Sequence, residues 1–341
     1  MKNIRKISTV TIEDVAQAAN VSVATVSRVL NNGSTVTDKS RNAVIAAIKD
    51  LGYVPNIAAR NFRKRESRVI LVVAPNFTNP FYAHILDGIS DAARAHNYNA
   101  FISSHNENSH GEFLKNAFET RQIDGAILLA STMNDEWLGD LARKYPLVQC
   151  AEYVDALNIP SVSIDNYSAM REIINHLIQI GHRRIALISS TNCYISTKLR
   201  EKAYNDAIRA ANFEIEPMIT FAAENYTFES GMTAAQQLMS LPRSPTAIAC
   251  VSDVLALGAM AEIQRRGKSV PGDISVAGFD DVDYTKMAHP YLTTIEQPCY
   301  EMGKRSVELL LNYMQGNTNE SRIFMNYTFQ QRESTAKLIC R

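Results

Sequence analysis

The side chains best suited to reading another molecule lie close together near the N-terminus. Val23 and Ala24 carry small methyl surfaces, and Arg28 carries a guanidinium four residues after Ala24. In the major groove of B-DNA, methyl groups contact thymine methyls and an arginine forks onto guanine. Short hydroxyls that can hold phosphates stand beside them, at Ser22, Thr25 and Ser27. These residue types predict contact with the base edges and the backbone of duplex DNA.

Two short helices joined by a tight turn would position these side chains. Thr11 is a natural N-cap for the first helix, Asn20 ends it, and Ser22 can cap the second. The apolar residues of the first helix recur on one face, at Ile12, Val15, Ala16 and Ala19. Those of the second helix point back toward the first, at Val26, Val29 and Leu30. The outward face of the second helix is left to residues 23, 24, 25, 27 and 28.

A third helix is expected between Thr37, its N-cap, and Gly52, which stands just past its end. Its expected buried stripe comprises Val44, Ile45, Ile48 and Leu51. Three short helices form one miniature core, so residues 1–54 are expected to form a separate all-α head. The alternative is a generic three-helix packing unit, because helical pairs with short turns are common.

Charge separates this head from the rest of the chain. Residues 1–68 hold 12 Lys/Arg against 5 Asp/Glu, a net +7, while the remaining 273 residues hold 23 against 30, a net −7. A basic head attracts the phosphate backbone, and an acidic body discourages nonspecific wrapping. Basic clusters at residues 2–6 and 60–68 flank the helices, which favours phosphate contact over a merely solvated charged face.

Residues 21–31 (VSVATVSRVLN) and 52–56 (GYVPN) resemble the head of the lactose-repressor family. The resemblance implies a helix-turn-helix bacterial transcription factor that binds a roughly palindromic operator as a dimer, with one head per half-site. In such repressors the first, second and sixth residues of the recognition helix read bases, here Val23, Ala24 and Arg28. The DNA contacts that the resemblance implies are Thr11, Ser22, Val23, Ala24, Thr25, Ser27, Arg28, Asn31, Tyr53, Asn56, Ala59, Arg60 and Phe62.

The family also places a hinge helix after the head, ordered on operator binding, and residues 55–67 occupy that stretch. An apolar side chain of the hinge wedges into the minor groove and kinks the duplex. Phe62 stands where the family usually has leucine. This bulkier side chain and the modest helix propensity of Asn56 and Asn61 predict a weakly ordered hinge or tolerance of variable half-site spacing. The alternative is a flexible basic linker.

Beyond Ser67, strand-like apolar runs alternate with amphipathic stretches, which indicates parallel sheets covered by helices. The runs are residues 69–74, 100–103, 125–130, 147–151, 185–189, 247–251 and 274–278. About 270 residues is large for one hydrophobic core, so two α/β lobes are expected in the body, residues 68–341.

The body resembles the periplasmic sugar-binding protein fold that this family uses, with the effector between the lobes. Its markers are residues 79–82 (NPFY), 181–185 (GHRRI), 252–258 (SDVLALG), 278–281 (GFDD) and 292–298 (LTTIEQP). By that fold the N-lobe comprises about 68–160 plus 296–322, and the C-lobe about 161–295 plus 323–341. The chain would then cross between the lobes three times, near residues 160–166, 293–297 and 321–326.

Ligand contacts are expected at the carboxyl ends of the strands, where open parallel sheets leave a crevice. Arg200 matches the family arginine that reaches the effector, and Asp280 matches an aspartate that accepts hydrogen bonds from ligand hydroxyls or ring nitrogens. The alternative is a structural Arg–Asp ion pair. Phe81 and Tyr82 can stack on a sugar or a base. The remaining candidates are Asn76, Tyr194, Ser196, Phe228 and Asp253.

Two features of the sequence bear on the effector. Purine-responsive members of the family carry an arginine where this chain has Tyr194, which argues against a purine corepressor. Residues 66–73, 164–166, 228–238 and 244–254 resemble a cytidine-responsive branch, although the head differs from it at Glu13, Val23 and Phe62. That branch is induced by cytidine, represses nucleoside uptake and catabolism, and binds with the cyclic-AMP receptor protein. A nucleoside is therefore expected, and a sugar that controls a carbohydrate operon is the alternative.

An enzyme is the competing interpretation from another class, because doubly wound sheets often hold dehydrogenases. Residues 69–80 contain no glycine and so lack the dinucleotide fingerprint, and the chain has no phosphate-binding Gly-x-x-x-x-Gly-Lys-Ser/Thr loop and no nucleophile elbow. His105 and His110 lack the spacing of helical metal ligands. We therefore expect no catalysis, no cofactor and no metal.

A solute-binding receptor without a DNA role is the second competitor. It would need export, but the N-terminus has no apolar signal core and the longest apolar run, Val69–Ala74, is too short to cross a membrane. The five cysteines are scattered and odd in number, which suits a reducing cytoplasm. We expect a bacterial, cytoplasmic, nucleoid-associated homodimer that pairs through residues 80–97 and the segment after Tyr300. With no leucine-heptad tail, a dimer is favoured over a tetramer.

Overall fold

The structure is a computed structural model that describes residues 10–30, 35–54, 66–75, 78–104, 110–131, 136–213, 220–223, 226–317 and 321–338. The chain divides into two compact units, residues 1–66 and 67–341. Each unit buries its own hydrophobic residues.

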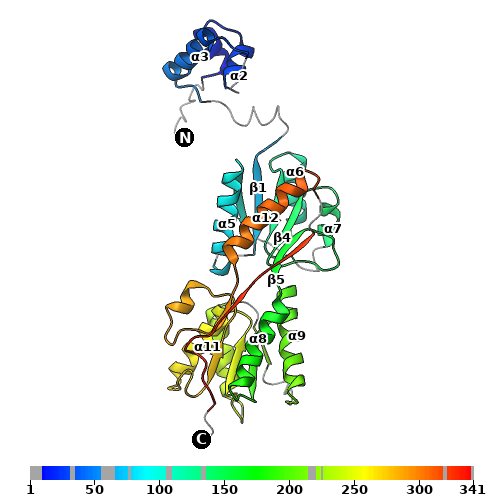
Figure 1. The fold of residues 1–341 in the computed structure, drawn as a ribbon, viewed down its shortest axis with the longest axis vertical. Helices are drawn as coiled ribbons and strands as arrows, with labels where there is room; N and C mark the ends of the chain where they lie inside the picture. The colour runs from blue at the N-terminus through cyan, green and yellow to red at the C-terminus, as the bar shows by residue number, and fades with distance from the viewer. Residues whose placement is uncertain are drawn as a thin grey trace, which may run out of the picture. The chain divides into compact units, whose positions relative to one another are not determined.

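The first unit is a bundle of three short helices, drawn in blue in Figure 1: α1 (Ile12–Ala18), α2 (Val23–Leu30) and α3 (Asp38–Leu51). Thr11 caps α1 and Thr37 caps α3, because each hydroxyl accepts a hydrogen bond from an orphan amide three residues on. Gly52, with φ +63°, ends α3 in the left-handed conformation that glycine adopts at no steric cost. The core comprises Val15, Ala16, Val26, Val29, Val44 and Ala47.

The stripe expected for α3 is wrong at two positions. Ile45 is 53% exposed and Leu51 is 38% exposed, whereas Ala47 is buried. Successive helix residues lie about 100° apart, so Ile45 turns away from the face that Val44, Ala47 and Ile48 share. Apolar character alone could not decide which residues of α3 face inward.

The N-lobe of the body is built on a six-stranded parallel sheet in the order β11-β5-β4-β3-β1-β2. Its strands are β1 (Val69–Ala74), β2 (Asn99–Ser104), β3 (Gly125–Leu128), β4 (Leu147–Cys150), β5 (Ser161–Ile164) and β11 (Arg322–Met325). Its helices are α5 (Phe81–Ala95), α6 (His110–Glu119), α7 (Glu136–Ala142) and α12 (Cys299–Met314). Helices α5 and α12 pack together and share one hydrophobic cluster with the sheet, while α6 and α7 contribute to a separate cluster.

The C-lobe is built on a four-stranded parallel sheet in the order β7-β6-β8-β9. Its strands are β6 (Ile185–Ser190), β7 (Thr220–Ala223), β8 (Ala247–Cys250) and β9 (Ser275–Ala277). Its helices are α8 (Asn166–Gln179), α9 (Ile195–Ala210), α10 (Phe228–Met239), α11 (Asp253–Arg265) and the short 3₁₀ helix η2 (Asp283–Lys286). Helices α8 and α9 form one packed pair and α10 and α11 another.

The described chain passes between the lobes three times: from β5 into α8, from β10 (Thr294–Glu296) into α12, and from β11 into β12 (Thr328–Gln330) (Figure 1). Strands β10 and β12 form an antiparallel pair. Main-chain pairing of β5 with β4 and β11 keeps Ile164 and Met325 in the N-lobe sheet. The sheet thus runs a few residues past the lobe limits given above.

In each lobe, two helices cross in close contact at a pair of glycines, one on each helix. A Cβ on Gly88 of α5 would lie 2.0 Å from the Tyr300 carbonyl oxygen of α12, and one on Gly303 would lie 2.2 Å from that of Ile85. In the C-lobe, Gly258 of α11 and Gly231 of α10 make the same close approach to the backbone of the partner helix. Both helix pairs therefore pack at a distance that any side chain would increase.

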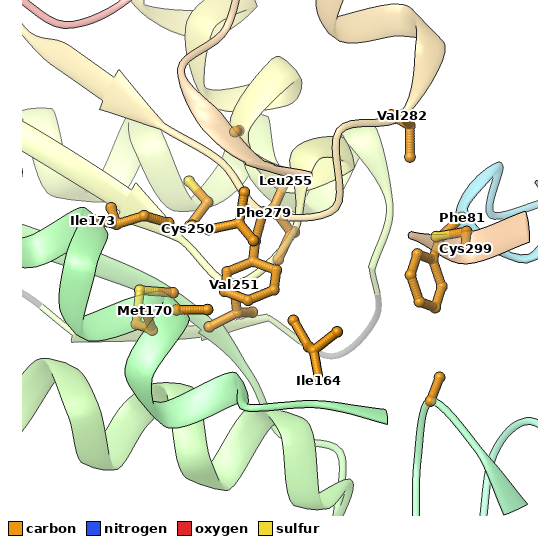
Figure 2. Close-up of a cluster of buried hydrophobic side chains, with 14 of the residues drawn as sticks. Phe81, Ile164, Met170, Ile173, Cys250, Val251, Leu255, Phe279, Val282 and Cys299 are labelled. Atoms are coloured by element: carbon orange, nitrogen blue, oxygen red, sulfur yellow. The ribbon is translucent and has the colours of Figure 1, made fainter. Parts of the chain in front are cut away.

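One hydrophobic cluster continues from the N-lobe into the C-lobe. Figure 2 shows Val251 and Phe279 beside Ile164 of β5, with Phe81 and Cys299 facing them from the N-lobe helices α5 and α12. The two lobes are therefore joined by apolar packing as well as by the three crossings. Within the described ranges, no helix is long and apolar enough to span a bilayer.

Candidate nucleic-acid interface and ligand site

The predicted recognition helix has one exposed and one buried face. Val23, Ala24 and Arg28 are exposed, whereas Val26 and Val29 are buried against the other two helices. Leu30 is half-buried, as are Thr25 and Ser27. Helical geometry thus collects the three predicted base-reading side chains on the outward face of α2.

The hydroxyls near this face also stabilise helix ends. Ser22 Oγ accepts a hydrogen bond from the Thr25 amide at 3.1 Å and lies 2.9 Å from Thr25 Oγ1. Thr11 and Asp14 form a reciprocal capping box, and these hydrogen bonds lower the pKa of Asp14. Tyr53 is half-buried against the head core. Five predicted DNA contacts, together with one predicted ligand contact, lie outside the described residues: Asn31, Asn56, Ala59, Arg60, Phe62 and Asn76.

In the body, Arg200 on α9 is buried and tightly held. Its Nε and Nη2 donate to Asn166 Oδ1 at 2.9 and 2.7 Å, and its Nη1 donates to the Val251 carbonyl at 2.6 Å. The guanidinium carbon lies 3.6 Å from the centroid of the Phe279 ring. Contacts from three other segments fix the guanidinium, so Arg200 is oriented before any ligand arrives.

Asp280 lies beside this guanidinium. Its Oδ1 is 3.7 Å from Arg200 Nη1 and accepts a hydrogen bond from Gln297 Nε2 at 2.7 Å. Burial raises the pKa of Asp280 well above its usual value, although Arg200 opposes the shift. Its φ of +123° is rare for a residue with a side chain, and the backbone pairing of Asp280 with Glu296 helps to hold it there. The predicted ligand contact and the alternative ion pair thus involve the same two side chains.

Glu152 joins the lobes and was missed by sequence reasoning. It follows β4 in the N-lobe, and its carboxylate accepts hydrogen bonds from the amide of Ser196, at 3.1 Å, and from the Ser196 hydroxyl. Ser196 lies in the first turn of α9 in the C-lobe. Burial raises the pKa of Glu152 to about 7, with Ser196 and Arg200 acting in the opposite direction. A single glutamate forms no recognisable motif in the sequence. The one signal for Glu152 is its position just after β4, at the carboxyl-terminal edge of the parallel sheet.

Aromatic side chains complete the group. Phe81 and Tyr82 are buried edge to face, with ring centroids 5.2 Å apart. Burial raises the pKa of Tyr82 well above its usual value, and the charges of nearby Tyr194 and Glu152 raise it further. Tyr226, also missed from the sequence, has its hydroxyl 2.5 Å from Thr197 Oγ1. We define the inter-lobe cluster as Tyr82, Glu152, Tyr194, Ser196, Arg200, Tyr226 and Asp280.

Asp253 and Phe228 have other surroundings. Both Asp253 oxygens are bonded within the protein: one accepts from the Val282 amide at 3.0 Å and the other from Thr294 Oγ1 at 2.6 Å. Burial raises the pKa of Asp253 to about 7. Phe228 is 39% exposed at the start of α10. Their predicted ligand contacts stay predictions.

Two surface grooves lie away from the inter-lobe cluster. One, of about 370 Å³, lies between α6 and α7 and includes Trp137; the other, of about 410 Å³, lies beside α8 and includes His176. Among the residues that the structure describes, no group of three or more His, Cys, Asp or Glu side chains is arranged to hold a metal ion. The inter-lobe cluster, built from both lobes, is where the predicted ligand residues Arg200, Asp280 and Ser196 lie together with Glu152.

Family comparisons match both units. The model of bacterial regulatory proteins of the lacI family matches residues 11–56, and that of a periplasmic binding protein-like domain matches residues 174–335. The HTH-type transcriptional repressor CytR of Escherichia coli (strain K12) is 39% identical over 319 residues, covering 93% of each chain. Catabolite control protein A of Priestia megaterium is 34% identical, covering 96% of this chain and 99% of that protein.

Comparison with solved structures gives the same family. The lac repressor dimer bound to operator and the anti-inducer ONPF has a TM-score of 0.88 at 27% identity, covering 96% of this chain and 100% of that chain. These matches confirm the predicted fold class, a helix-turn-helix head followed by an α/β body like the periplasmic binding proteins. The chain belongs to the lacI family of bacterial regulatory proteins.

Proposed function

We propose that this transcriptional repressor binds operator half-sites through the outward face of α2 and that a small molecule at the inter-lobe cluster sets its operator affinity. The observation that carries the DNA-binding part is the exposure of Val23, Ala24 and Arg28 over buried Val26 and Val29. A major groove admits one helix, and this face offers it two methyl surfaces and a forked donor. The DNA contacts of Asn31, Asn56, Ala59, Arg60 and Phe62 belong to the same proposal.

The ligand in this proposal is a nucleoside such as cytidine. The resemblance of residues 66–73, 164–166, 228–238 and 244–254 to a cytidine-responsive branch supports this choice. So does the site chemistry, because Glu152 and Asp280 offer acceptors to ligand donors while Phe81 and Tyr82 offer ring surfaces. A sugar is the second candidate, since the stacking surface suits a sugar face and relatives include a ribose operon repressor of Haemophilus influenzae, 30% identical.

Control of DNA binding follows from linkage. If the ligand favours one arrangement of the lobes and the operator favours another, each weakens the binding of the other by the same factor. If both favour the same arrangement, the ligand recruits the protein to DNA instead. No chemical step is required, in keeping with a relative that is named as a transcriptional repressor.

The first test is thermal melting of the full-length protein with cytidine, uridine, adenosine, purine bases and a panel of sugars. A ligand at about a hundred times its Kd stabilises the protein by roughly 2.7 kcal/mol. We expect a shift with cytidine that Arg200→Ala and Asp280→Ala both abolish, while Asp206→Asn, at a half-buried position of α9 paired with Lys202, keeps it. A shift with sugars alone would replace the nucleoside by a carbohydrate and leave the repressor assignment intact.

Selection from a random duplex library tests the DNA-binding part. The wild-type protein is expected to enrich a palindrome, and Arg28→Ala is expected to lose the preference for one base pair in each half-site, at about 1–3 kcal/mol. Recovery of the same sequence preference with Arg28→Ala would remove Arg28 from base reading. Partnership with the cyclic-AMP receptor protein stays a prediction, and a gel shift with both proteins on one recovered site checks it.

We also propose a homodimer in the cytoplasm, as a palindromic operator requires. Of the surfaces expected to pair, α5 and the segment after Tyr300 pack on each other through Gly88 and Gly303. The edge strand β2 beside them offers a further surface, since Phe101 and Ile102 are 59% and 49% exposed. A second copy of the chain would cover this uncharged edge.

A further inference from the structure

We propose that Glu152 keeps phosphorylated molecules out of the inter-lobe site, so that the effector is an unphosphorylated nucleoside or sugar. The inference rests on the proposed ligand site and adds the chemical state of its ligand. Three features carry it: the position of the Glu152 carboxylate, the bonding of Arg200, and the surplus of buried acids.

The first feature is that a protein carboxylate occupies the natural anion position of the site. Helix α9 has 16 residues, and no side chain of its own N-cap residue, Tyr194, caps it. The first amides of such a helix and its dipole attract an anion, phosphate above all. Here the carboxylate of Glu152, from the other lobe, bonds to the amide and hydroxyl of Ser196. A ligand phosphate would have to displace it or lie beside it.

The second feature is that the cation of the cluster is already engaged. Arg200 donates to Asn166 Oδ1 and to the Val251 carbonyl, and Asp280 lies 3.7 Å from its Nη1. Its guanidinium also stacks on Phe279. A forked arginine normally binds phosphate through two parallel donors, and the pair made by Nε and Nη2 is already committed to Asn166 Oδ1.

The third feature is charge. Glu152, Asp280 and Asp253 are all buried, and one buried guanidinium, Arg200, faces the first two. Burial raises the pKa of Glu152 and Asp280, and the same desolvation would disfavour a phosphate with close to two negative charges. Hydroxyls and amino groups, by contrast, donate to carboxyl oxygens and need no charge. The site therefore suits donors and disfavours anions.

Glu152→Gln tests the inference with little change in shape. The glutamine Oε1 keeps an acceptor for Ser196, while the variant loses the charge and gains amide donors. Asp206→Asn is the matched control, because it removes one carboxylate from the same helix ten residues beyond Ser196, about 15 Å along the axis. Asp206 pairs with Lys202 on the surface and touches no member of the inter-lobe cluster.

The experiment titrates the full-length wild-type protein and both variants with two pairs of ligands and one single ligand. These are cytidine against cytidine 5′-monophosphate, ribose against ribose 5-phosphate, and inorganic phosphate alone, each followed by calorimetry and thermal melting. We expect the wild type to prefer the unphosphorylated member of the binding pair by at least tenfold. In Glu152→Gln this preference is expected to fall at least tenfold and inorganic phosphate to raise the melting temperature, with Asp206→Asn like the wild type.

Two results would overturn the inference: equal binding of both members of a pair by the wild type, or a Glu152→Gln protein that still binds cytidine or ribose with an unchanged preference. If neither pair binds to any variant, the proposed ligands are wrong, but inorganic phosphate still decides the role of Glu152. Phosphate stabilisation of Glu152→Gln alone would then support the inference, and its absence would end it. Failure of the nucleoside proposal and failure of this inference are thus separate outcomes.

Discussion

Three buried carboxyl groups in the body, those of Glu152, Asp253 and Asp280, have shifted pKa values. Burial disfavours the charged form, which is why the pKa values of Glu152, Asp253 and Asp280 all lie above their usual range. Asp253 has its two oxygens bonded within one lobe, whereas Glu152 bonds across the lobe boundary. Protonation of Glu152 and contact between the lobes are therefore linked.

Glu152→Gln is expected to gain stability relative to the wild type as pH rises from 5 to 8. The folded pKa of Glu152, about 7, exceeds its ordinary value of 4.5, so its contribution is fully present below pH 4.5 and is lost as pH rises through 7. The difference of roughly 2.5 pH units corresponds to about 3 kcal/mol above pH 7. Melting curves of both proteins at several pH values measure it.

Asp206→Asn is the control for this pH experiment. Lys202 and Tyr167 lower the pKa of Asp206, so the stability it contributes is present above its ordinary pKa and is lost at lower pH than this range. Its melting temperature should follow that of the wild type from pH 5 to 8. Parallel curves for Glu152→Gln and the wild type would show that Glu152 does not titrate there.

The sequence predicted some cluster residues and missed others for a physical reason. Arg200 and Asp280 belong to recognisable motifs, and the structure brings them together at 3.7 Å. Glu152 and Tyr226 acquire their neighbours only when segments more than 25 residues apart fold together, as the bonds from Ser196 and Thr197 show. Contacts between segments so far apart cannot be predicted from a local sequence pattern.

Helix ends and strands were easier to predict than helix faces. The hydroxyl caps at Thr11, Ser22 and Thr37 act through neighbours three residues away, so the sequence contains the whole interaction. The apolar runs became strands because parallel sheets bury both faces. The predicted buried face of α3 was wrong at Ile45. Which of two neighbouring residues on α3 faces inward depends on how the helix packs against α1 and α2.

The crossed glycines of α10 and α11 give a prediction at this scale. Gly258→Ala places a Cβ 2.0 Å from the Phe228 carbonyl oxygen, so the two helices must separate. We expect a loss of about 1–3 kcal/mol in the free energy of unfolding, measured by urea denaturation.

Gly139→Ala in α7 is the matched control. Its Cβ would meet the ends of two flexible side chains, Leu157 at 3.3 Å and Arg143 at 3.9 Å, and the variant gains helix propensity, so a neutral or slightly stabilising effect is expected. Equal stability of both variants would show that the α10–α11 crossing relaxes without cost.

The surface proposed to pair two copies of the chain could not be recognised in the sequence. Alternation in β2 gave no hint that Phe101 and Ile102 would both be exposed, because edge position is a property of strand order. An uncharged edge strand is open to pairing unless something covers it. The covering partner that a palindromic operator calls for is a second copy of the chain.

Ile102→Lys is therefore expected to shift the protein from dimer to monomer in sedimentation velocity, with lower operator affinity as a consequence. Ile45→Lys is the control, since Ile45 is a similarly exposed apolar residue, 53% against 49%, on the head. An unchanged dimer in Ile102→Lys would place the subunit interface elsewhere.

The order in which the N-lobe receives its parts has a consequence for synthesis. Its sheet takes β1 to β5 from the first half of the chain, but β11 (Arg322–Met325) and the covering helix α12 (Cys299–Met314) come after the C-lobe strands β6 to β9. A chain growing on the ribosome can fold its head early, because residues 1–66 contain a complete core. The N-lobe must wait for the last part of the message to be translated. A nascent chain thus completes its helical head well before it completes the lobe that carries Tyr82 and Glu152.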